Sequence, residues 1–504
     1  MSLKSNILAN YASQIYVTLI GIVMVPVYVQ YMGAEAYGLV GFFTMLQAWF
    51  QLLDIGLTPT MARATARYNG GAIDQRSLRQ LLRALEGIFV GVAFVGSIAI
   101  LVGANKIAAE WLQVQHLAVS EVREAIVLMG FIVALRWVSG LYRGVISGFE
   151  KMVWLSGFNI AMATARFVLI IPVFLFVGSE PAHFFSYQLL LAVLELSILI
   201  YKAYSSLPKG VQENGARWSW GPLRGVLKFS LSIAFTSSVW ILITQTDKLV
   251  LSKLLPLADY AYFTLAVLVA GGVMALSGPI SSALLPRLTR MAAINDDVGL
   301  TKLYRGATQL VGVATIPASL VLALFSEQVL WAWTGDIAIA RAAGPVLQLY
   351  ALGNGILTLA AFPYYLQYAK GDMRLHLIGN AVFIIMLIPA LIWGTAKYGV
   401  IGAGYAWLIS NFLYFILWVP KVHNRFYKGL HFNWLTSDVT KPILVTSLAA
   451  LAIRSIVEWP QDRALMAVSL VVIGIFLLLT TAVTSKQIRA RLVSSSRALL
   501  LKKY

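Results

Sequence analysis

Three charged side chains lie near the middle of long apolar stretches of the sequence, at Arg136, Arg166 and Glu195. At 1.5 Å per helical residue, all three come out about 16 Å deep, near the midplane of a hydrocarbon core of roughly 30 Å. Charges at this depth cannot face lipid cheaply. Two arginines and one carboxylate leave one positive charge, and guanidinium groups match phosphate oxygens. The set predicts a cationic site for pyrophosphate or an acidic sugar.

Arg143 and three glycines share the predicted helix of Arg136. Arg143 comes two turns after Arg136, so it extends the cationic face toward the end of the helix. Gly140, Gly144 and Gly148 permit a close approach of another backbone. The competing interpretation of all these charges is a buried ion-pair network that fixes the order of the helices.

The stretch 228–253 is long enough to cross a bilayer as a helix, yet it carries Asp247 and Lys248 inside its apolar run. Sequence neighbours point about 100° apart on a helix, so each of the two is expected to find a partner on another helix. Lys248 is a further candidate cation of the binding site. Asp247 is a candidate for coupling to H⁺ or Na⁺, because desolvation favours its neutral form and a nearby cation its charged form. A fixed salt bridge is the alternative.

Asp54 is the remaining deep acid. Gly56 and Pro59 follow it and weaken or bend the helix there. A hinge at this point competes with proton or cation binding, so Asp54 is the alternate coupling or gating residue. Glu195 belongs to the same group of candidate gating acids.

Polar side chains form a stripe on the first predicted helix, where Asn6, Asn10, Gln14 and Thr18 recur every four residues. Gln245 lies with Lys248 on a similar stripe of the stretch 228–253. These stripes predict the wall of a polar cavity. Helix packing through small polar residues is the alternative.

The composition excludes several classes of protein. Of 504 residues, 59% are hydrophobic and only 12% are charged, whereas soluble domains are about 25% charged. The chain is therefore an all-helical, polytopic membrane protein. Its net charge of +18 indicates basic cytoplasmic loops rather than a nucleic-acid partner. There is no cysteine, and the five histidines are not at ligand spacing, so neither a metal nor another bound cofactor is expected.

Fourteen apolar stretches are long enough to span a membrane. They lie at residues 8–31, 39–60, 81–104, 125–146, 155–178, 185–205, 228–254, 260–285, 305–325, 343–368, 377–396, 400–420, 441–458 and 463–484. If the N-terminus is cytoplasmic, 29 of the 39 Lys and Arg residues fall in loops or tails on that side. The positive-inside rule therefore predicts that both termini are cytoplasmic.

A weak repeat at an offset of 224 residues aligns Glu35 with Asp259 and Arg63 with Arg287. Six spans separate the copies, so the two lobes are expected to have the same orientation. The predicted parts are an N-terminal lobe at 1–205, a cytoplasmic linker at 206–227, a C-terminal lobe at 228–420, two additional spans at 421–484 and a basic cytoplasmic tail at 485–504.

Six motifs occur in an order and spacing that resemble one family of membrane transporters. They read SNILANYASQIY, YMGAEAYGLVGFF, LLDIGLTPT, TDKLVLSKLLPLADYAYFTLA, LLPRLTR and YYLQYAKGDMRLHLIGN. The chain is similar to the Wzx-type O-antigen flippases, the polysaccharide-transporter branch of the multidrug/oligosaccharidyl-lipid/polysaccharide exporter superfamily. The resemblance implies two six-helix lobes around a central cationic cavity. It also implies alternating access that moves an undecaprenyl-diphosphate-linked oligosaccharide across the bacterial inner membrane.

The same resemblance implies contact with membrane lipids and with the polymerase and chain-length regulator of a polysaccharide pathway. Two other transporters stay open as alternatives, namely a multidrug or cation antiporter, which would have twelve spans, and a lipid II flippase. An enzyme such as a polymerase or acyltransferase would need an acid, a base and a nucleophile outside the membrane. The sequence holds no such set, so the chain is not expected to be an enzyme.

Overall fold

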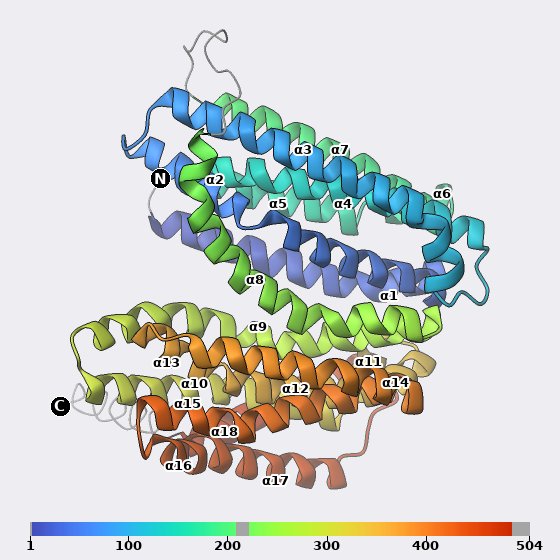
Figure 1. The fold of residues 1–504 in the computed structure, drawn as a ribbon. Helices are drawn as coiled ribbons and strands as arrows, with labels where there is room; N and C mark the ends of the chain where they lie inside the picture. Colours follow the sequence, from blue (N-terminus) through green and yellow to red (C-terminus); the bar gives the residue numbers. More distant parts are fainter. Residues whose placement is uncertain (1–2, 208–220, 486–504) are drawn as a thin grey trace, which may run out of the picture. The chain divides into compact units, whose positions relative to one another are not determined.

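The computed structural model describes residues 3–207 and 221–485, except for the side chains of 3–5, 7, 221–237 and 282. All regular elements of this part of the chain are helices, as Figure 1 shows. Most of the predicted linker and the predicted basic tail, except Ser485, lie outside the described residues. The chain is an all-helical, multi-pass membrane protein.

Eleven helical segments of the described chain are long and apolar enough to cross a membrane. Two of them, Leu8–Asp54 and Arg374–Phe426, are 47 and 53 residues long, and each covers two predicted spans. The predicted span 228–254 lies in a helix whose side chains are described only from residue 238 onward. The number fourteen therefore stays a prediction.

The described chain divides into two compact units, Met1–Ala261 and Tyr262–Tyr504. Elements of the first unit are α1 (Leu3–Phe50), the 3₁₀ turn η1 (Gln51–Asp54), α2 (Leu57–Asn69), α3 (Gln75–Lys106), the π turn η2 (Ile107–Trp111), α4 (Val119–Gly148), α5 (Met152–Phe167), α6 (Ile171–Phe176), α7 (Pro181–Ser206), α8 (Gly221–Leu254) and the start of α9 (Leu257–Ala293). The predicted lobe boundaries at 205 and 228 are not tested by this division.

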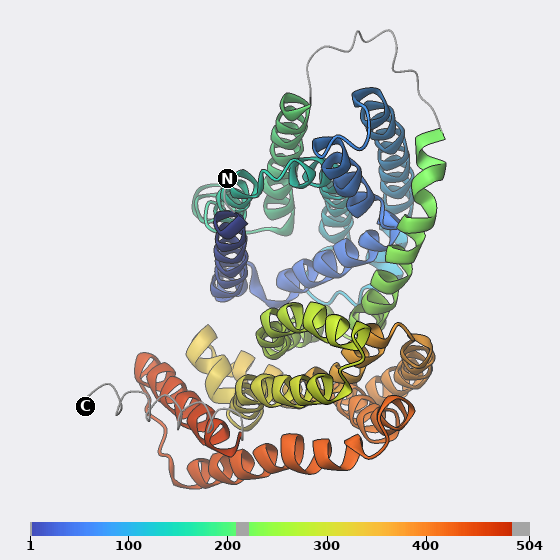
Figure 2. The same cartoon turned by 90° about the vertical axis from the view of Figure 1, so that its left-hand side faces the viewer.

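The second unit holds the rest of α9 and the remaining helices. They are α10 (Asp297–Leu324), α11 (Ser326–Thr334), α12 (Ile337–Ala360), α13 (Phe362–Lys370), α14 (Arg374–Leu417), α15 (Val419–Phe426), α16 (Leu430–Trp434), the π turn η4 (Leu435–Thr440), α17 (Lys441–Ile456) and α18 (Arg463–Thr484). The short helices α15 and α16 lie largely between the predicted spans 400–420 and 441–458. Figure 2 shows α17 and α18 after them in red tones.

Backbone breaks with positive φ values lie inside the long helices α1 and α14 and between η1 and α2. Gly33 in α1 has φ 82° and ψ 166°, and Gly399 in α14 has φ 59° and ψ −142°. Glycine adopts such positive φ values without steric cost, so the chain reverses there. The bend predicted near Gly56 is confirmed: Ile55 has φ 46°, Gly56 has φ 71°, and α2 begins at Leu57.

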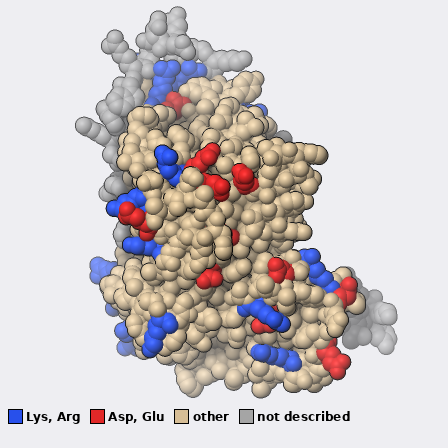
Figure 3. All heavy atoms as spheres, turned by 90° about the vertical axis from the view of Figure 1, so that its right-hand side faces the viewer, with Lys and Arg blue, Asp and Glu red and all other residues tan. Residues whose placement is uncertain are grey.

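Charged side chains are sparse on the surfaces of both units, as Figure 3 shows for one face. Large apolar side chains are exposed along the long helices, for example Phe94 on α3 at 65% and Phe476 on α18 at 53%. Exposed apolar rows of this kind would be a liability in water, whereas lipid solvates them. The surface therefore agrees with a membrane-spanning chain.

Helix α4 is the packing centre of the first unit. Its buried face contacts α3, α7 and α2, and Trp137 stacks on Phe89 of α3 with ring centroids 4.3 Å apart. On the α2 side, glycines replace larger side chains. A Cβ atom on Gly144 would lie 2.8 Å from the carbonyl oxygen of Thr58, so only glycine lets the two backbones approach this closely.

The last two helices, α17 and α18, are joined to α10 by a buried carboxylate. Asp438 in η4 is fully buried, and it accepts hydrogen bonds from Arg305 Nε at 2.5 Å and from Gln309 Nε2 at 2.7 Å. Ser485 Oγ, after α18, donates to Gln309 Oε1 at 2.9 Å. Between α17 and α18, the hydroxyl groups of Thr446 and Thr481 lie 2.8 Å apart.

Gly148→Ala tests the close approach of α4 and α2. The added Cβ would lie 2.5 Å from the carbonyl oxygen of Ala62 and 2.5 Å from the Cβ of Thr65. Overpacking of this kind costs about 1–3 kcal/mol, so we expect a lower melting temperature of the purified protein in detergent. Gly157→Ala on α5 is the control, because its Cβ would meet nothing within 4 Å. Equal melting temperatures of the two variants would contradict the packing described.

Candidate functional site

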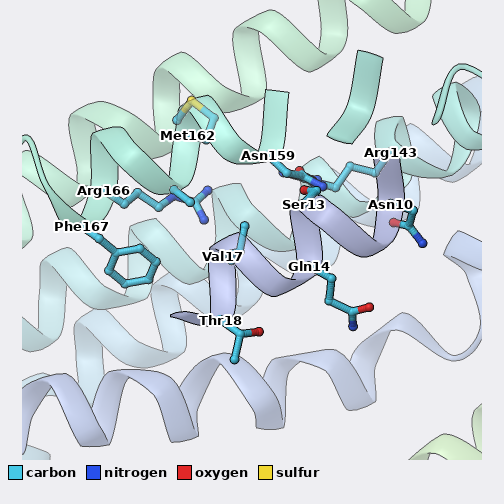
Figure 4. A pocket seen from close by; sticks show the side chains of 11 residues that line it. Asn10, Ser13, Gln14, Val17, Thr18, Arg143, Asn159, Met162, Arg166 and Phe167 are labelled. Atoms are coloured by element: carbon cyan, nitrogen blue, oxygen red, sulfur yellow. The ribbon is translucent and has the colours of Figure 1, made fainter. Parts of the chain in front are cut away.

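A cavity of about 410 Å³ lies within the first unit, between α1, α4 and α5. Figure 4 shows the α1 side chains on one wall and those of α5 on the other, with Arg143 of α4 beside Asn159. The wall is formed by Asn10, Ser13, Gln14, Val17, Thr18, Arg143, Asn159, Met162, Ala163, Arg166 and Phe167. Two of the predicted binding arginines, together with Asn10, Gln14 and Thr18 of the predicted α1 stripe, therefore line one cavity.

Glu195 of α7 is shared by the two cavity arginines. Its Oε1 accepts a hydrogen bond from Arg143 Nη2 at 2.6 Å, and its Oε2 pairs with Arg166 Nη2. The Glu195 side chain is only 3% exposed, whereas those of Arg143 and Arg166 are 28% and 21% exposed. The carboxylate thus lies behind the guanidinium groups, which keep part of their surface open to the cavity.

A polar partner from α5 completes the environment of Arg143. Asn159 Oδ1 accepts a hydrogen bond from Arg143 Nη1 at 2.5 Å. Asn159 is seven residues before Arg166, and seven residues are close to two helical turns, so both project from one face of α5. Helices α4, α5 and α7 together hold the cluster.

Arg136 occupies a separate level of the same helices. Its Nη1 donates to Gln47 Oε1 at 3.1 Å and its Nη2 to Gln188 Oε1 at 2.8 Å. Gln188 Nε2 in turn donates to the backbone carbonyl of Arg166 at 3.1 Å. Arg136 does not line the cavity, and among the ion pairs of the described residues it has no carboxylate partner. It therefore adds charge behind the wall.

Two side-chain pairs, which we call rungs, join α4 and α7, and the paired residues are equally far apart in the sequence. Arg136 with Gln188 and Arg143 with Glu195 are both pairs 52 residues apart. Equal separations require the two helices to run parallel and in register. The sequence predicts Arg136, Arg166 and Glu195 at one depth. Arg166 does pair with Glu195, but the second partner of the carboxylate is Arg143 and not Arg136, which lies at the level of Gln188, seven residues before Glu195.

The cluster carries a surplus of positive charge. Three guanidinium groups and one carboxylate leave a formal charge of two positive units, one more than the three residues first singled out. Among the described side chains, the Nε atoms of Arg136 and Arg166 are buried without a hydrogen-bond acceptor. A low-polarity setting strengthens the attraction of such a cluster for an anion. The charge of the cavity wall is therefore suited to an anion.

The α1 wall is attached to α5 by two tyrosines. Tyr16 Oη and Thr164 Oγ1 lie 2.7 Å apart, and Tyr28 Oη donates to the carbonyl of Phe167 at 3.0 Å. Asn10, Gln14 and Thr18 are exposed and line the cavity, as the four-residue spacing predicts, whereas neighbouring Ser13 is buried.

Asp54 stabilises the break between η1 and α2. Its Oδ1 accepts hydrogen bonds from the backbone N–H of Thr58 at 3.1 Å and from Thr58 Oγ1 at 2.8 Å. Through Thr58, which contacts Gly140 and Gly144, the break is packed against α4. This position suits the hinge interpretation, and a role of Asp54 in proton or cation binding stays a prediction.

The charged pair of α8 lies apart from this cavity. Lys248 Nζ donates to Gln245 Oε1 at 2.9 Å on its own helix rather than on another one. Asp247 is 2% exposed, and its Oδ1 accepts a hydrogen bond from the backbone N–H of Lys248 at 2.7 Å. Neither Lys248 nor Gln245 lines the cavity, so their predicted binding role stays a prediction.

The sequence reasoning missed three polar residues that hold the arginines. Gln47, Asn159 and Gln188 are uncharged, and single amides inside apolar spans are easily taken for helix-packing residues. The signal in the sequence that could have identified two of them, Asn159 and Gln188, is a seven-residue spacing from a charged residue. Asn159 precedes Arg166 by seven residues and Gln188 precedes Glu195 by seven, as Arg136 precedes Arg143. Within the described residues, no group of three His, Asp or Glu side chains is arranged to hold a metal.

Solved structures with a similar fold are membrane transporters. The lipid II flippase MurJ in an inward closed conformation has a TM-score of 0.67 and 13% identity, with 98% of this chain and 100% of that chain covered. An inward-facing multidrug resistance transporter of the MATE family has a TM-score of 0.66 and 14% identity, with 82% and 96% covered. The chain thus has the fold of the multidrug/oligosaccharidyl-lipid/polysaccharide transporter superfamily.

Sequence comparison narrows this class. A Shigella flexneri protein with the name "Putative O-antigen transporter" is 18% identical over 419 residues, covering 82% of this chain and 96% of its own length. The chain belongs to the polysaccharide biosynthesis protein family, whose model matches residues 3–292. The family membership confirms the resemblance seen in the sequence motifs.

Proposed function

We propose that this protein is a flippase for undecaprenyl-diphosphate-linked oligosaccharides, such as the repeat units of O-antigen, capsule or exopolysaccharide. The cation-rich cavity of the first unit is the observation that carries the proposal. A drug or cation antiporter would place acids rather than arginines where its cationic substrate binds. The family membership and the names of similar proteins support transport rather than enzymatic catalysis.

The charge of the cluster matches that of the substrate. A diphosphate diester carries one negative charge on each phosphate, and the cluster of Arg136, Arg143, Arg166 and Glu195 has two positive charges in surplus. Arg143 and Arg166 present guanidinium groups to the cavity and suit phosphate oxygens. Glu195 occupies their inner faces and keeps them oriented. Arg136 adds long-range attraction behind the wall.

The polar α1 wall suits the hydroxyl groups of the glycan or the diphosphate. Asn10, Gln14 and Thr18 offer donors and acceptors opposite the arginines. Membrane lipids would solvate the polyprenyl chain outside the cavity. A polymerase and a chain-length regulator of the same pathway are the further partners that we propose.

The binding role is tested by Arg143→Ala and Arg166→Ala. We expect either variant to abolish surface glycan in cells that lack the wild-type copy. Affinity of the purified protein for farnesyl diphosphate should fall about 30-fold or more, since losing a charge-assisted contact costs about 2 kcal/mol or more. Lysine at either position should recover part of the activity, because it keeps the charge but not the planar fork.

Glu195→Gln separates binding from a purely structural network. If the network only fixes the helices, Arg143→Ala and Glu195→Gln should lower protein abundance to the same extent. If the arginines bind the diphosphate, Glu195→Gln removes a competing anion, and farnesyl diphosphate should bind at least as tightly as to wild type. Normal glycan export from a well-expressed Arg143→Ala, Arg166→Ala double variant would exclude the binding role.

We also propose that both termini face the cytoplasm of the bacterial inner membrane and that the substrate moves from the cytoplasmic to the periplasmic leaflet. The asymmetry of 29 basic residues out of 39 supports this orientation. Reporter tags at the C-terminus should give a cytoplasmic signal, and tags near Gly33 or Gly335 a periplasmic one. A cytoplasmic signal at Gly335 would overturn the orientation.

Ion coupling is proposed for Asp247 on α8. A buried carboxylate beside Lys248 has a different proton or Na⁺ affinity when its surroundings change, and such a difference biases a conformational equilibrium. In reconstituted vesicles, Asp247→Asn should abolish the response of transport to an imposed pH or Na⁺ gradient while substrate binding survives. Asp54→Asn is the matched variant. A wild-type gradient response in Asp247→Asn would assign coupling elsewhere.

A further inference from the structure

Helix α5 ends in the cavity wall, one residue after Arg166. Its last residue is Phe167, and α6 begins at Ile171 after a turn at residues 168–170. Pro172, at the start of α6, has no N–H for the carbonyl of residue 168, and in a continuous helix its ring would clash with that carbonyl. The sequence therefore breaks the helix directly after a cavity arginine.

The break turns away backbone donors that a continuous helix would use. The N–H of Leu169 would bond to the carbonyl of Ala165, but it donates to the carbonyl of Thr164 at 3.2 Å. The N–H of Ile171 would bond to the carbonyl of Phe167, but it donates within the turn instead. A carbonyl without a donor is costly inside a membrane protein, so the end of α5 needs donors from elsewhere.

Side chains of two other helices supply these donors to the successive carbonyls of residues 165–167. Tyr187 Oη of α7 donates to the first carbonyl at 2.8 Å, and Gln188 Nε2 of α7 donates to the second at 3.1 Å. Tyr28 Oη of α1 donates to the third at 3.0 Å. Each of the three carbonyls thus has its own side-chain donor, and the last turn of α5 is attached to both α7 and α1.

Tyr28 contacts the chain on both sides of the break. Its hydroxyl bonds to α5, whereas its ring lies edge-on to Phe174 of α6 with centroids 6.0 Å apart. The side chain is 3% exposed. Tyr31, one turn further along α1, stacks on the same Phe174 at 5.5 Å, but its hydroxyl forms no hydrogen bond with the described residues. The two tyrosines therefore differ mainly in what their hydroxyl groups bind.

We propose that Tyr28, Tyr187 and Gln188 are positioning residues for Arg166, which fix the place where its guanidinium group meets the substrate. This inference rests on the proposed function and adds the groups that hold one of its two cavity arginines. A carbonyl that loses its side-chain donor has to turn toward another donor, and this moves the last turn of α5, to which Arg166 belongs. Arg143 lies within the regular helix α4 and does not depend on these donors.

The displacement of one arginine predicts a change in ligand preference rather than a general loss of binding. A diphosphate offers one phosphate group to Arg143 and the other to Arg166, whereas a monophosphate offers a single group. Wild-type protein should therefore bind farnesyl diphosphate about 10-fold more tightly than farnesyl monophosphate, the value of one hydrogen bond to a charged group. A purely structural defect would reduce the fraction of folded protein and affect both probes equally.

Tyr28→Phe tests the proposal, because it removes the hydroxyl group and keeps the ring contacts. Binding of both farnesyl probes is measured on the full-length protein in lipid nanodiscs. We expect the preference for the diphosphate to fall to about threefold or less, while the affinity for the monophosphate stays within about twofold of wild type. Tyr187→Phe, which removes the donor to Ala165, should shift the preference in the same direction.

Tyr31→Phe is the matched control. It makes the same chemical change on the same helix, but it removes a hydroxyl that holds no carbonyl, so the wild-type preference should persist. Wild-type preference in both Tyr28→Phe and Tyr187→Phe would overturn the positioning role and leave the proposed function standing. An equal loss of affinity for both probes in these two variants would also overturn it. Wild-type protein that binds neither probe would overturn the proposed function as well.

Discussion

A carboxylate shared between two guanidinium groups is the constraint on which the first unit depends. Glu195 is almost completely buried and cannot be left unpaired in a span, because a lone charge there costs several kcal/mol. Its partners come from α4 and α5, so α4, α5 and α7 must pack together at this level. The arginines then need further acceptors, which Asn159, Gln47 and Gln188 provide. The need to pair Glu195 thus determines both which helices pack together and which charged groups line the cavity.

The same rule explains the attachment of α17 and α18 in the second unit. Asp438 is fully buried and takes its hydrogen bonds from Arg305 and Gln309 of α10. A π turn holds this carboxylate just before α17, and Ser485 extends the contact beyond α18. Helices that add little to the cavity are therefore attached by a polar contact, since apolar packing alone does not distinguish protein from lipid.

Much of this structure could be predicted from the sequence, for reasons that differ between elements. Apolar stretches of about 20 residues predict spans because the bilayer fixes their length, and charges inside them predict a cavity because lipid rejects charge. Partners could not be predicted. The predicted depths placed both Arg136 and Arg166 beside Glu195. Arg166 pairs with the carboxylate as expected, but its second partner is Arg143 rather than Arg136. The partner of Lys248 was expected on another helix, whereas Gln245, one turn away on the same helix, accepts its hydrogen bond.

The equal spacing of the two rungs between α4 and α7 restricts where this sequence can change in length. Seven residues separate the rungs on each helix, about 10.5 Å along the axis. Deleting or inserting one residue between Arg136 and Arg143 would turn the second arginine by about 100° and move it by 1.5 Å, so it would leave Glu195 and face a different helix. A compensating insertion or deletion between Gln188 and Glu195 would not restore the contacts. Helix α5 also contacts both residues, since its Asn159 accepts a hydrogen bond from Arg143 and its Arg166 pairs with Glu195. Length variation among related chains should therefore be confined to the loops, while these two seven-residue intervals stay constant.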